Sequence, residues 1–277
     1  MAQLPTTIDY SSNWQPGTLG LLANVSGPLP MPDHATFAGL EFVSDLCGEG
    51  HLYPGVCDTT PPAKTFDPCD EPGGCGLTGG LPFWTYVSEV CGAAGRSLAQ
   101  AETRIRRKAT LRRSFLVERA FWGDDASAPG YLQQLGVTPI GAEANLALAL
   151  GALEQDAADN FGLPVLIHVR AGMASRLGAA GLIRTTSGFL TTWKGNRIVV
   201  GDGYGGVDAA GDPLGAGVEQ MWATGPVTVW EGDLQVPEPR QTLNRTTNQL
   251  YLLAEQPWII AHECYAGVIT VPAPVEA

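Results

Sequence analysis

The chain is organised around one segment, Phe121-Trp122-Gly123-Asp124-Asp125-Ala126-Ser127-Ala128-Pro129-Gly130-Tyr131-Leu132. It follows a long helical pattern, and its aromatic pair closes that helix. Gly123 predicts the helix stop, because glycine enters the left-handed conformation without steric cost. The acidic pair then starts a turn, and Pro129-Gly130 turns the chain again before it re-enters a core.

A long helix is predicted before this segment, over residues 97–122. Ser97 is a suitable N-cap, because its hydroxyl can accept a hydrogen bond from the first turn. One apolar stripe recurs at helical spacing, made by Leu98, Ala101, Ile105, Ala109, Leu116 and Ala120. At about 1.5 Å per residue the helix is roughly 35 to 40 Å long, enough to form the backbone of a whole domain.

The part that follows the segment alternates helices and strands and then becomes strand-rich. A second helix is predicted over 142–160, with a stop at Gly162. A short helix is predicted at 171–177. Strands are predicted at 165–169, 196–200, 226–230, 248–254, 257–262 and 266–271. Helices in the middle and strands at both ends indicate an α+β fold rather than a repeating βαβ chain.

The first 80 residues are predicted to be irregular. Residues 58–80 are so rich in Pro and Gly that neither a helix nor a core strand is expected. A strand follows at 81–87. A loop of this length is either a surface loop or an arm that becomes ordered on a neighbouring subunit.

Composition favours a chain whose surface is partly covered by other subunits. Hydrophobic residues make up 44% of the 277 residues, whereas charged residues make up only 16%, well below the usual quarter. The net charge of −12 argues against nucleic acid as a general partner. The N-terminus lacks the basic and apolar regions of a secretory signal, and no apolar run is long enough for a bilayer, so we expect a protein made in a cytoplasm.

The basic residues are nevertheless concentrated in the long helix. Six of the 16 lie close together: Arg104, Arg106, Arg107, Lys108, Arg112 and Arg113. Arginine forks suit phosphate groups, so some of them are candidate contacts for interior DNA or for other subunits. The competing interpretation is a solvated helix face paired with Glu102 and Glu118. Because the six point in several directions around the helix, both interpretations stay open.

No catalytic, cofactor-binding or metal-binding residue is predicted. The glycines at 201–206 do not match a dinucleotide fingerprint, and no helical pattern follows them. His262-Glu263-Cys264 alternate faces on a predicted strand and therefore cannot converge on one ion. His168 lies in an apolar run and is expected to be a hydrogen-bonded core residue. The acidic residues Asp67, Asp70 and Glu71 lack the spacing of a calcium loop.

Five of the six cysteines cluster in the N-terminal third: Cys47, Cys57, Cys69, Cys75 and Cys91. No C-x-x-C pair is present, so free thiols are favoured over disulfides, and a metal site is the least favoured.

The junction and the closing strands together carry a family resemblance. The helix ends in Ala120-Phe121-Trp122-Gly123-Asp124-Asp125, and Pro129-Gly130-Tyr131-Leu132 follows. Near the C-terminus, a run of alternating apolar residues begins at Asn248 and ends at Ala254-Glu255. Tyr265-Ala266-Gly267-Val268 follows it. In this order the features resemble the tailed-phage major capsid proteins of the Hong Kong ninety-seven type. In that family the helix end reads A-F-x-x-G-D-G, and P-x-G-[IL]-[IL] follows after a few residues. Here Asp125 replaces the second glycine, and Gly130 follows Pro129 directly.

The resemblance covers about 81–271 and implies a capsid fold with an N-terminal arm, an extended loop, a spine helix, and peripheral and axial domains. The implied boundaries are 1–57 for the arm and irregular segment, 58–86 for the extended loop, 87–130 with 226–271 for the peripheral domain, and 131–225 for the axial domain.

The implied function is self-assembly, through hexamers and pentamers, into the icosahedral head shell around double-stranded DNA of a tailed bacteriophage. The implied location is the virion, after assembly in the host cytoplasm. Implied partners are copies of the chain, packaged DNA held by non-specific electrostatics, and decoration, scaffolding and portal proteins, with no membrane. An encapsulin-like compartment is the alternative, and an unrelated α+β enzyme or ligand-binding protein is a third.

Overall fold

The computed structural model of the chain describes residues 19–33, 35–43, 77–92, 97–123, 132, 137, 139–205, 214–215, 218–237, 243–244 and 249–272. Its helices are α1 (Leu21–Asn24), α2 (Ala35–Ala38), α3 (Leu98–Trp122), α5 (Leu146–Asn160) and α6 (Ala171–Ala179). Its strands are β1 (Ser26–Pro30), β2 (Leu40–Val43), β3 (Leu77–Gly80), β4 (Phe83–Gly92), β5 (Leu166–Arg170), β6 (Ile183–Thr186), β7 (Phe189–Thr192), β8 (Arg197–Gly201), β9 (Val218–Thr224), β10 (Val227–Glu231), β11 (Leu243–Asn244), β12 (Gln249–His262) and β13 (Ala266–Pro272).

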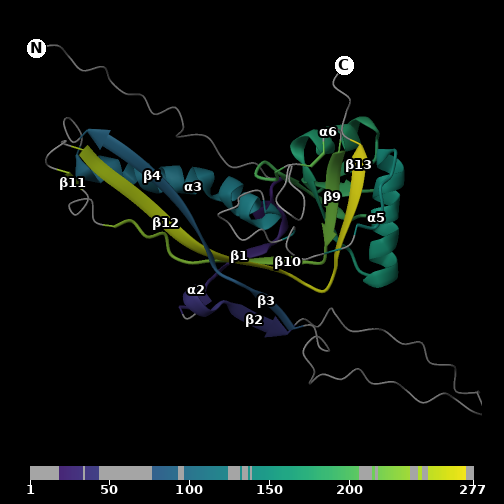
Figure 1. Cartoon of the computed structure of the whole chain (residues 1–277), viewed down its shortest axis with the longest axis horizontal. Coiled ribbons are helices and arrows are strands. Elements are labelled where there is room, and N and C mark those ends of the chain that lie inside the picture. Colours follow the sequence, from purple (N-terminus) through teal and green to yellow (C-terminus); the bar gives the residue numbers. More distant parts are fainter. Residues whose placement is uncertain are drawn as a thin grey trace, which may run out of the picture.

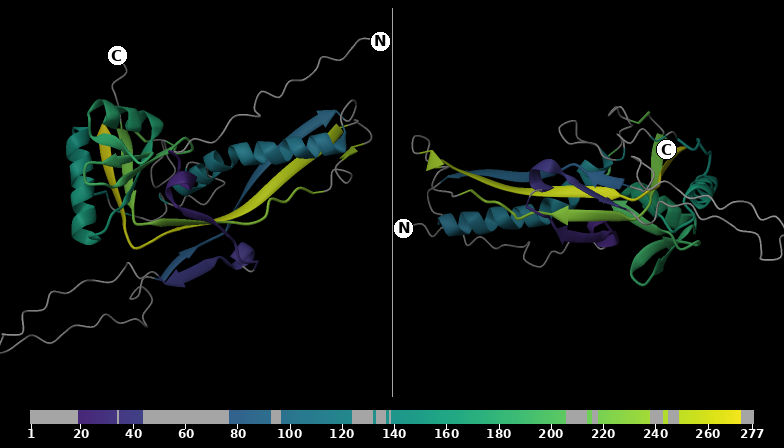
Figure 2. Two further views of the ribbon diagram at one scale, coloured as in Figure 1. Left: turned by 180° about the vertical axis from the view of Figure 1, so that it is seen from behind. Right: turned by 90° about the horizontal axis from the view of Figure 1, so that it is seen from below.

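One half of the molecule is a long ribbon of strands with α3 laid along it (Figure 1). The strand order is β1-β10-β12-β11, and β4 pairs with the other side of β12. The β4–β12 pairing is antiparallel and runs from Gly92 opposite Gln249 to Phe83 opposite Trp258. Figure 2 shows α3 lying against one face of this ribbon. Apolar side chains of both elements are buried there, among them Val87, Ile105 and Leu252. We call this half the peripheral half.

Helix α3 has both ends where the sequence places them. Ser97 accepts a hydrogen bond from the Gln100 N–H, and the Gln100 side chain accepts one from the Ser97 N–H, so a complete capping box is present. At the other end Gly123 adopts φ 96° and its N–H donates to the Arg119 carbonyl. The predicted stripe is confirmed at Ala101 and Ile105, whereas Leu98 is exposed. The segment 124–131 lies outside the described residues.

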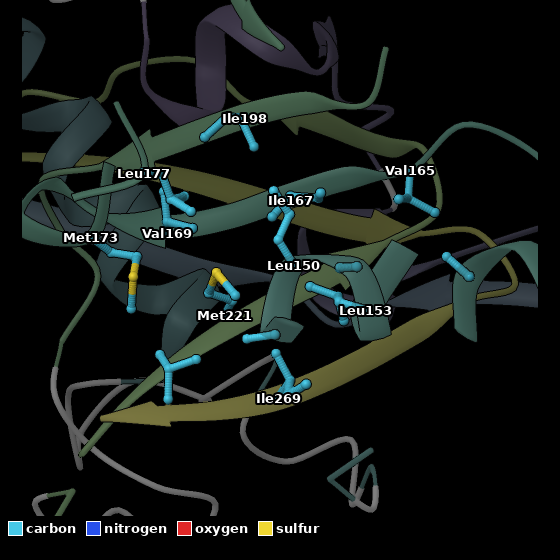
Figure 3. Close-up of a cluster of buried hydrophobic side chains, with 14 of the residues drawn as sticks. Leu150, Leu153, Val165, Ile167, Val169, Met173, Leu177, Ile198, Met221 and Ile269 are labelled. Carbon is cyan, nitrogen blue, oxygen red and sulfur yellow. The ribbon is translucent and has the colours of Figure 1, made fainter. Parts of the chain in front are cut away.

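The other half, the axial half, is a six-stranded sheet in the order β13-β9-β5-β8-β7-β6. The pairing of β5 with β8 is parallel and the remaining pairings are antiparallel. Helices α5 and α6 share one hydrophobic core with the sheet, which Figure 3 shows in close-up. Leu150 and Leu153 of α5 and Met173 and Leu177 of α6 are buried against it. The α+β class that the sequence predicts is confirmed for this half, in which two helices pack on one sheet.

The aromatic pair at the end of α3 joins the two halves. Phe121 and Trp122 are fully buried. The Trp122 ring stacks on Tyr204 at 4.7 Å between ring centroids and meets Trp222 edge-on at 6.5 Å. Tyr204 and Trp222 belong to the axial half, and the same cluster contains Trp258 of the peripheral ribbon. The chain therefore packs its two halves together around the residues that end the spine helix.

Two expectations about chain organisation need correction. The C-terminal strand β13 pairs with β9 over its whole length, so it belongs to the axial sheet and not to the peripheral domain. The N-terminal part is not irregular throughout, because β1 pairs with β10 and β2 pairs with β3. Residues 44–76, which connect β2 and β3, lie outside the described residues.

Candidate functional site

The structure gives the basic cluster on α3 partners within the same chain. Arg104 pairs with Glu89 at 3.1 Å, Arg106 with Glu102 at 2.9 Å, and Arg113 with Glu231 at 3.6 Å. The Arg104 and Arg113 contacts tie the helix to the ribbon beneath it, since Glu89 lies on β4 and Glu231 on β10, whereas the Arg106–Glu102 pair lies within α3.

The other three residues of the cluster differ in the contacts that they make. The Lys108 ammonium donates to the Ser88 carbonyl at 2.8 Å, and Arg107 also interacts within the chain. Arg112 is exposed and has no hydrogen bond or ion pair in the described part of the chain. The pairing with Glu102 is confirmed, whereas the expected pairing of the cluster with Glu118 is wrong. Contact of these residues with DNA or with other subunits stays a prediction.

Glu118 is instead a buried carboxylate at the junction, with 2% of its surface exposed. One oxygen accepts the Leu21 N–H at 2.9 Å, and the other accepts the Gly203 N–H at 3.1 Å. The Ser114 hydroxyl lies 3.4 Å from the first oxygen. Glu118 thus fastens the N-terminal helix α1 and the loop after β8 to α3. Burial raises the pKa of this carboxyl above its ordinary value, although both N–H donors act to lower it.

The glycine-rich loop after β8 serves this packing. A Cβ on Gly203 would overlap the Phe115 carbonyl oxygen and would lie 2.8 Å from the Arg119 nitrogen. Only glycine lets the loop approach α3 closely enough to donate to Glu118. The close approach to α3 therefore gives Gly203 a structural reason.

His168 lies at the centre of a buried polar chain on the axial side of the junction. It is fully buried; its Nδ1 lies 3.0 Å from the Tyr204 hydroxyl and its Nε2 lies 2.9 Å from the Thr224 hydroxyl. Burial lowers the pKa of His168 to about 3, with a smaller contribution from His262. The prediction of a hydrogen-bonded core histidine is confirmed.

A groove runs between β4 and α3 on the peripheral half, with a volume of about 840 Å³. One wall is formed by Pro82 and by the β4 residues from Phe83 to Ser88. On the α3 side it is lined by Lys108, Arg112, Phe115, Leu116, Arg119 and Ala120. Four large apolar side chains are exposed on the ribbon face turned away from α3. They are Trp84, Tyr86, Val90 and Tyr251, and 42% to 63% of the surface of each is exposed. The signal for this surface in the sequence is the stretch 83–87, which is rich in aromatic residues.

The described residues hold no group of three or more His, Cys, Asp or Glu side chains arranged to bind a metal ion. Within the same part of the chain, no helix combines the length and the apolar character needed to cross a membrane. His262 ends β12, while Cys264 adopts φ 61° in the following turn and is disulfide-bonded, so the expectation of free thiols is wrong for this cysteine. Asp67, Asp70 and Glu71 lie outside the described residues.

Comparison with known proteins shows likeness in structure. No protein-family model matches the sequence, and no curated protein matches it. The capsid of an empty GTA particle superposes with a TM-score of 0.56 and 12% identity, over 99% of this chain and 96% of that one. A structure titled Mycobacterium phage Cain gives 0.53 and 10%, with the same two coverages. The holo-SrpI encapsulin complex of Synechococcus elongatus gives 0.52 and 11%, over 97% and 91%.

At such low identity the likeness concerns the fold, and it extends over nearly the whole chain. The chain has the capsid fold of the Hong Kong ninety-seven type, as the order of its sequence elements predicts.

Proposed function

We propose that this chain is a major capsid protein that self-assembles into the icosahedral head shell around the double-stranded DNA of a tailed bacteriophage. The observation that carries the proposal is the likeness to capsid structures over 99% of the chain, with 96% of each of those chains covered in turn. The likeness includes both halves and the junction between them.

The exposed surface supports an assembling subunit. Trp84, Tyr86 and Val90 stand on one strand, and Tyr251 stands beside them opposite Val90. Contiguous apolar side chains of this size mark interaction sites on soluble proteins. Charged residues make up only 16% of the sequence, so little of the surface is suited to permanent contact with water. Both features fit a protein whose working state is a shell of identical copies.

In the proposed assembly, hexamers and pentamers of this chain form the shell, and packaged DNA interacts with it through non-specific electrostatics. The chain acts in the virion after assembly in the host cytoplasm. Its role is structural and requires no catalysis. Decoration, scaffolding and portal proteins are further proposed partners.

Electron microscopy of the purified full-length chain tests the proposal. We expect closed shells of uniform size, and a compact monomer or small oligomer at every concentration would contradict it. The likeness to an encapsulin complex, at a TM-score of 0.52, makes a compartment that encloses protein the second candidate. Nuclease treatment of shells recovered from the native source distinguishes the two, because protected double-stranded DNA supports the capsid and enclosed protein without DNA supports the compartment.

Neutralising the basic face of α3 is expected to lower DNA retention more than shell formation. The variant replaces Arg106, Arg107 and Arg113 by glutamine. Exposed ion pairs such as Arg106–Glu102 contribute only about 0.3 to 0.5 kcal/mol, so the subunit is expected to fold and assemble, whereas the loss of three cations weakens a polyanion interaction strongly.

The measurement is nuclease-protected DNA per shell, compared with the yield of shells. A matched control removes three exposed cations from the axial half, namely Arg184, Lys194 and Arg197. Equal loss of shells and of DNA in the α3 variant would instead assign the cluster to contacts between subunits.

A further inference from the structure

Residues 160–201 form an acid-free stretch in an acidic chain. They contain no Asp or Glu, whereas the whole chain carries a net charge of −12. The basic residues of the stretch are Arg170, Arg176, Arg184, Lys194 and Arg197. The stretch includes β5, α6 and strands β6 to β8 of the axial half. Positive charge is therefore concentrated in one part of the axial half.

Two of these arginines lie on the sheet face that α5 and α6 leave uncovered. Arg184 on β6 and Arg197 on β8 both pair with Thr191 of β7, and residues paired across strands share a face. Their neighbours along the chain, Ile183 and Ile198, pack instead in the core with the helices. Both arginines are exposed. Their Cα atoms lie about 10 Å apart, since one strand separates them.

Each of the two arginines is stacked on an aromatic ring. The Arg184 guanidinium carbon lies 5.0 Å from the ring centroid of Trp193, and that of Arg197 lies 4.2 Å from the ring centroid of Phe189. The Trp193 N–H donates to the Gly181 carbonyl at 3.0 Å, which fixes the indole. Neither arginine forms an ion pair with any of the described residues. The rings therefore orient two guanidinium forks that an external oxyanion can bind.

The composition of this face favours a separate protein as its occupant. Trp193 is 66% exposed, and Trp and Arg are the residue types that carry most binding energy at protein interfaces. Permanent interfaces between identical copies are largely apolar, whereas this face is cationic. Single-stranded nucleic acid binds through bases stacked on free aromatic rings, but a guanidinium already lies over each ring here. Carboxylates of a protein partner match the two forks best.

We propose that the β6–β8 face binds an extended acidic segment of a protein other than this chain, with one carboxylate on Arg184 and another on Arg197. The proposal rests on the proposed function, since the partner would attach to a shell of this chain. In an extended segment, side chains on one side recur about every 7 Å. Acidic residues two to four positions apart can therefore reach both guanidiniums.

Binding of an acidic peptide to the unassembled full-length subunit tests the contact without requiring shells. The probe is a fluorescent peptide of about twelve residues with alternating Glu and Thr, and the same peptide with Gln for Glu is expected not to bind. Arg184→Gln and Arg197→Gln are each expected to weaken binding about tenfold. Lys194→Gln is the matched control and is expected to bind as the parent does, because the Lys194 ammonium donates to the Glu154 carbonyl of α5.

Two further variants distinguish a stacked guanidinium fork from positive charge alone. Arg184→Lys keeps the charge but loses the fork, and Trp193→Ala keeps Arg184 but removes the ring that orients it. Each is expected to weaken peptide binding about fivefold or more, with thermal unfolding as in Lys194→Gln. Affinity equal to that of the parent in Arg184→Gln, Arg197→Gln and Arg184→Lys would overturn the proposal, as would absence of binding to the parent.

The other possible occupants are tested with the double variant Arg184→Gln with Arg197→Gln. We expect it to form shells as the parent does, and loss of its shells would assign the face to contacts between copies and overturn the proposal. A DNA duplex of about 20 base pairs that binds the parent more tightly than the peptide, and the double variant more weakly, would also overturn it. If the parent itself forms no shells, the proposed function fails, and the peptide titration still decides whether this face binds an acidic segment.

Discussion

Glu118→Leu is expected to lower the free energy of unfolding of the subunit by about 4 kcal/mol. The carboxylate is 2% exposed and accepts the Leu21 and Gly203 N–H groups on separate oxygens. Leucine fills the space but accepts nothing, so both buried donors lose their partner, at about 1 to 3 kcal/mol each. Leu21 is the first residue of α1, and the Gly20 cap offers no side-chain acceptor. No capping side chain can therefore replace Glu118 as the acceptor for the Leu21 N–H.

Glu118→Gln is the matched control, and we expect an intermediate effect of about 2 kcal/mol. The amide oxygen can accept one of the two N–H groups, whereas the amide nitrogen is itself a donor and faces the other. Urea unfolding of the unassembled subunit at pH 7 measures all three proteins. Equal stability of Glu118→Leu and the parent would show that the Glu118 hydrogen bonds do not hold α1 and the Gly203 loop to α3.

Much of the fold was predictable because its signals are local. Helix α3 carries a capping box at Ser97 and a glycine stop at Gly123, and strands β5, β8, β10 and β13 coincide with apolar or alternating runs. Strand β12 was predicted as two pieces, 248–254 and 257–262. The structure contains one strand of 14 residues, since the long pairing with β4 continues across Pro257 opposite Trp84.

Other elements were not predicted, for identifiable reasons. The β6–β7 hairpin turns through Ser187 and Gly188, both with positive φ, and this two-residue Ser-Gly signal between β-branched and aromatic residues passed unnoticed. The paired strands of the first 43 residues find their partners far along the chain, as β1 does with β10, so no local pattern reveals them. The role of Glu118 depends on partners 97 and 85 positions away, and a helical pattern shows only that it lies on the long helix.

Acid is expected to destabilise the subunit through two histidines, His168, which is fully buried, and His262, which is partly buried. Burial lowers the pKa of His168 to about 3 and that of His262 to about 4, from an ordinary value of 6.5. Below about pH 6.5 the histidines of the unfolded chain bind protons, whereas those of the folded chain stay neutral until the pH approaches their lowered pKa values. The free energy of unfolding therefore falls as the pH falls below 6.5. Between pH 7 and pH 5 each histidine is expected to cost about 2 kcal/mol, and the pair about 4 kcal/mol.

The opposite sign applies to Glu118, whose pKa is raised by burial. In the window above its ordinary value of 4.5 the folded chain holds a proton that the unfolded chain has lost, so this group adds stability as the pH falls. The histidines dominate the pH dependence of the unfolding free energy, because there are two of them and because their protonation in the unfolded chain begins near pH 6.5. The measured decline in unfolding free energy is therefore expected to be somewhat shallower than the histidines alone would give.

His168→Gln isolates the contribution of one histidine. Glutamine offers a donor and an acceptor toward the Tyr204 and Thr224 hydroxyls but does not titrate between pH 7 and pH 5. We expect this variant to lose about half of the parent's pH dependence over that range, and the double variant with His262→Gln to lose nearly all of it. The measurement is urea unfolding at pH 7, 6 and 5. A parent-like slope in His168→Gln would place the acid response elsewhere, because the buried chain of His168, Tyr204 and Thr224 would then have no titrating member.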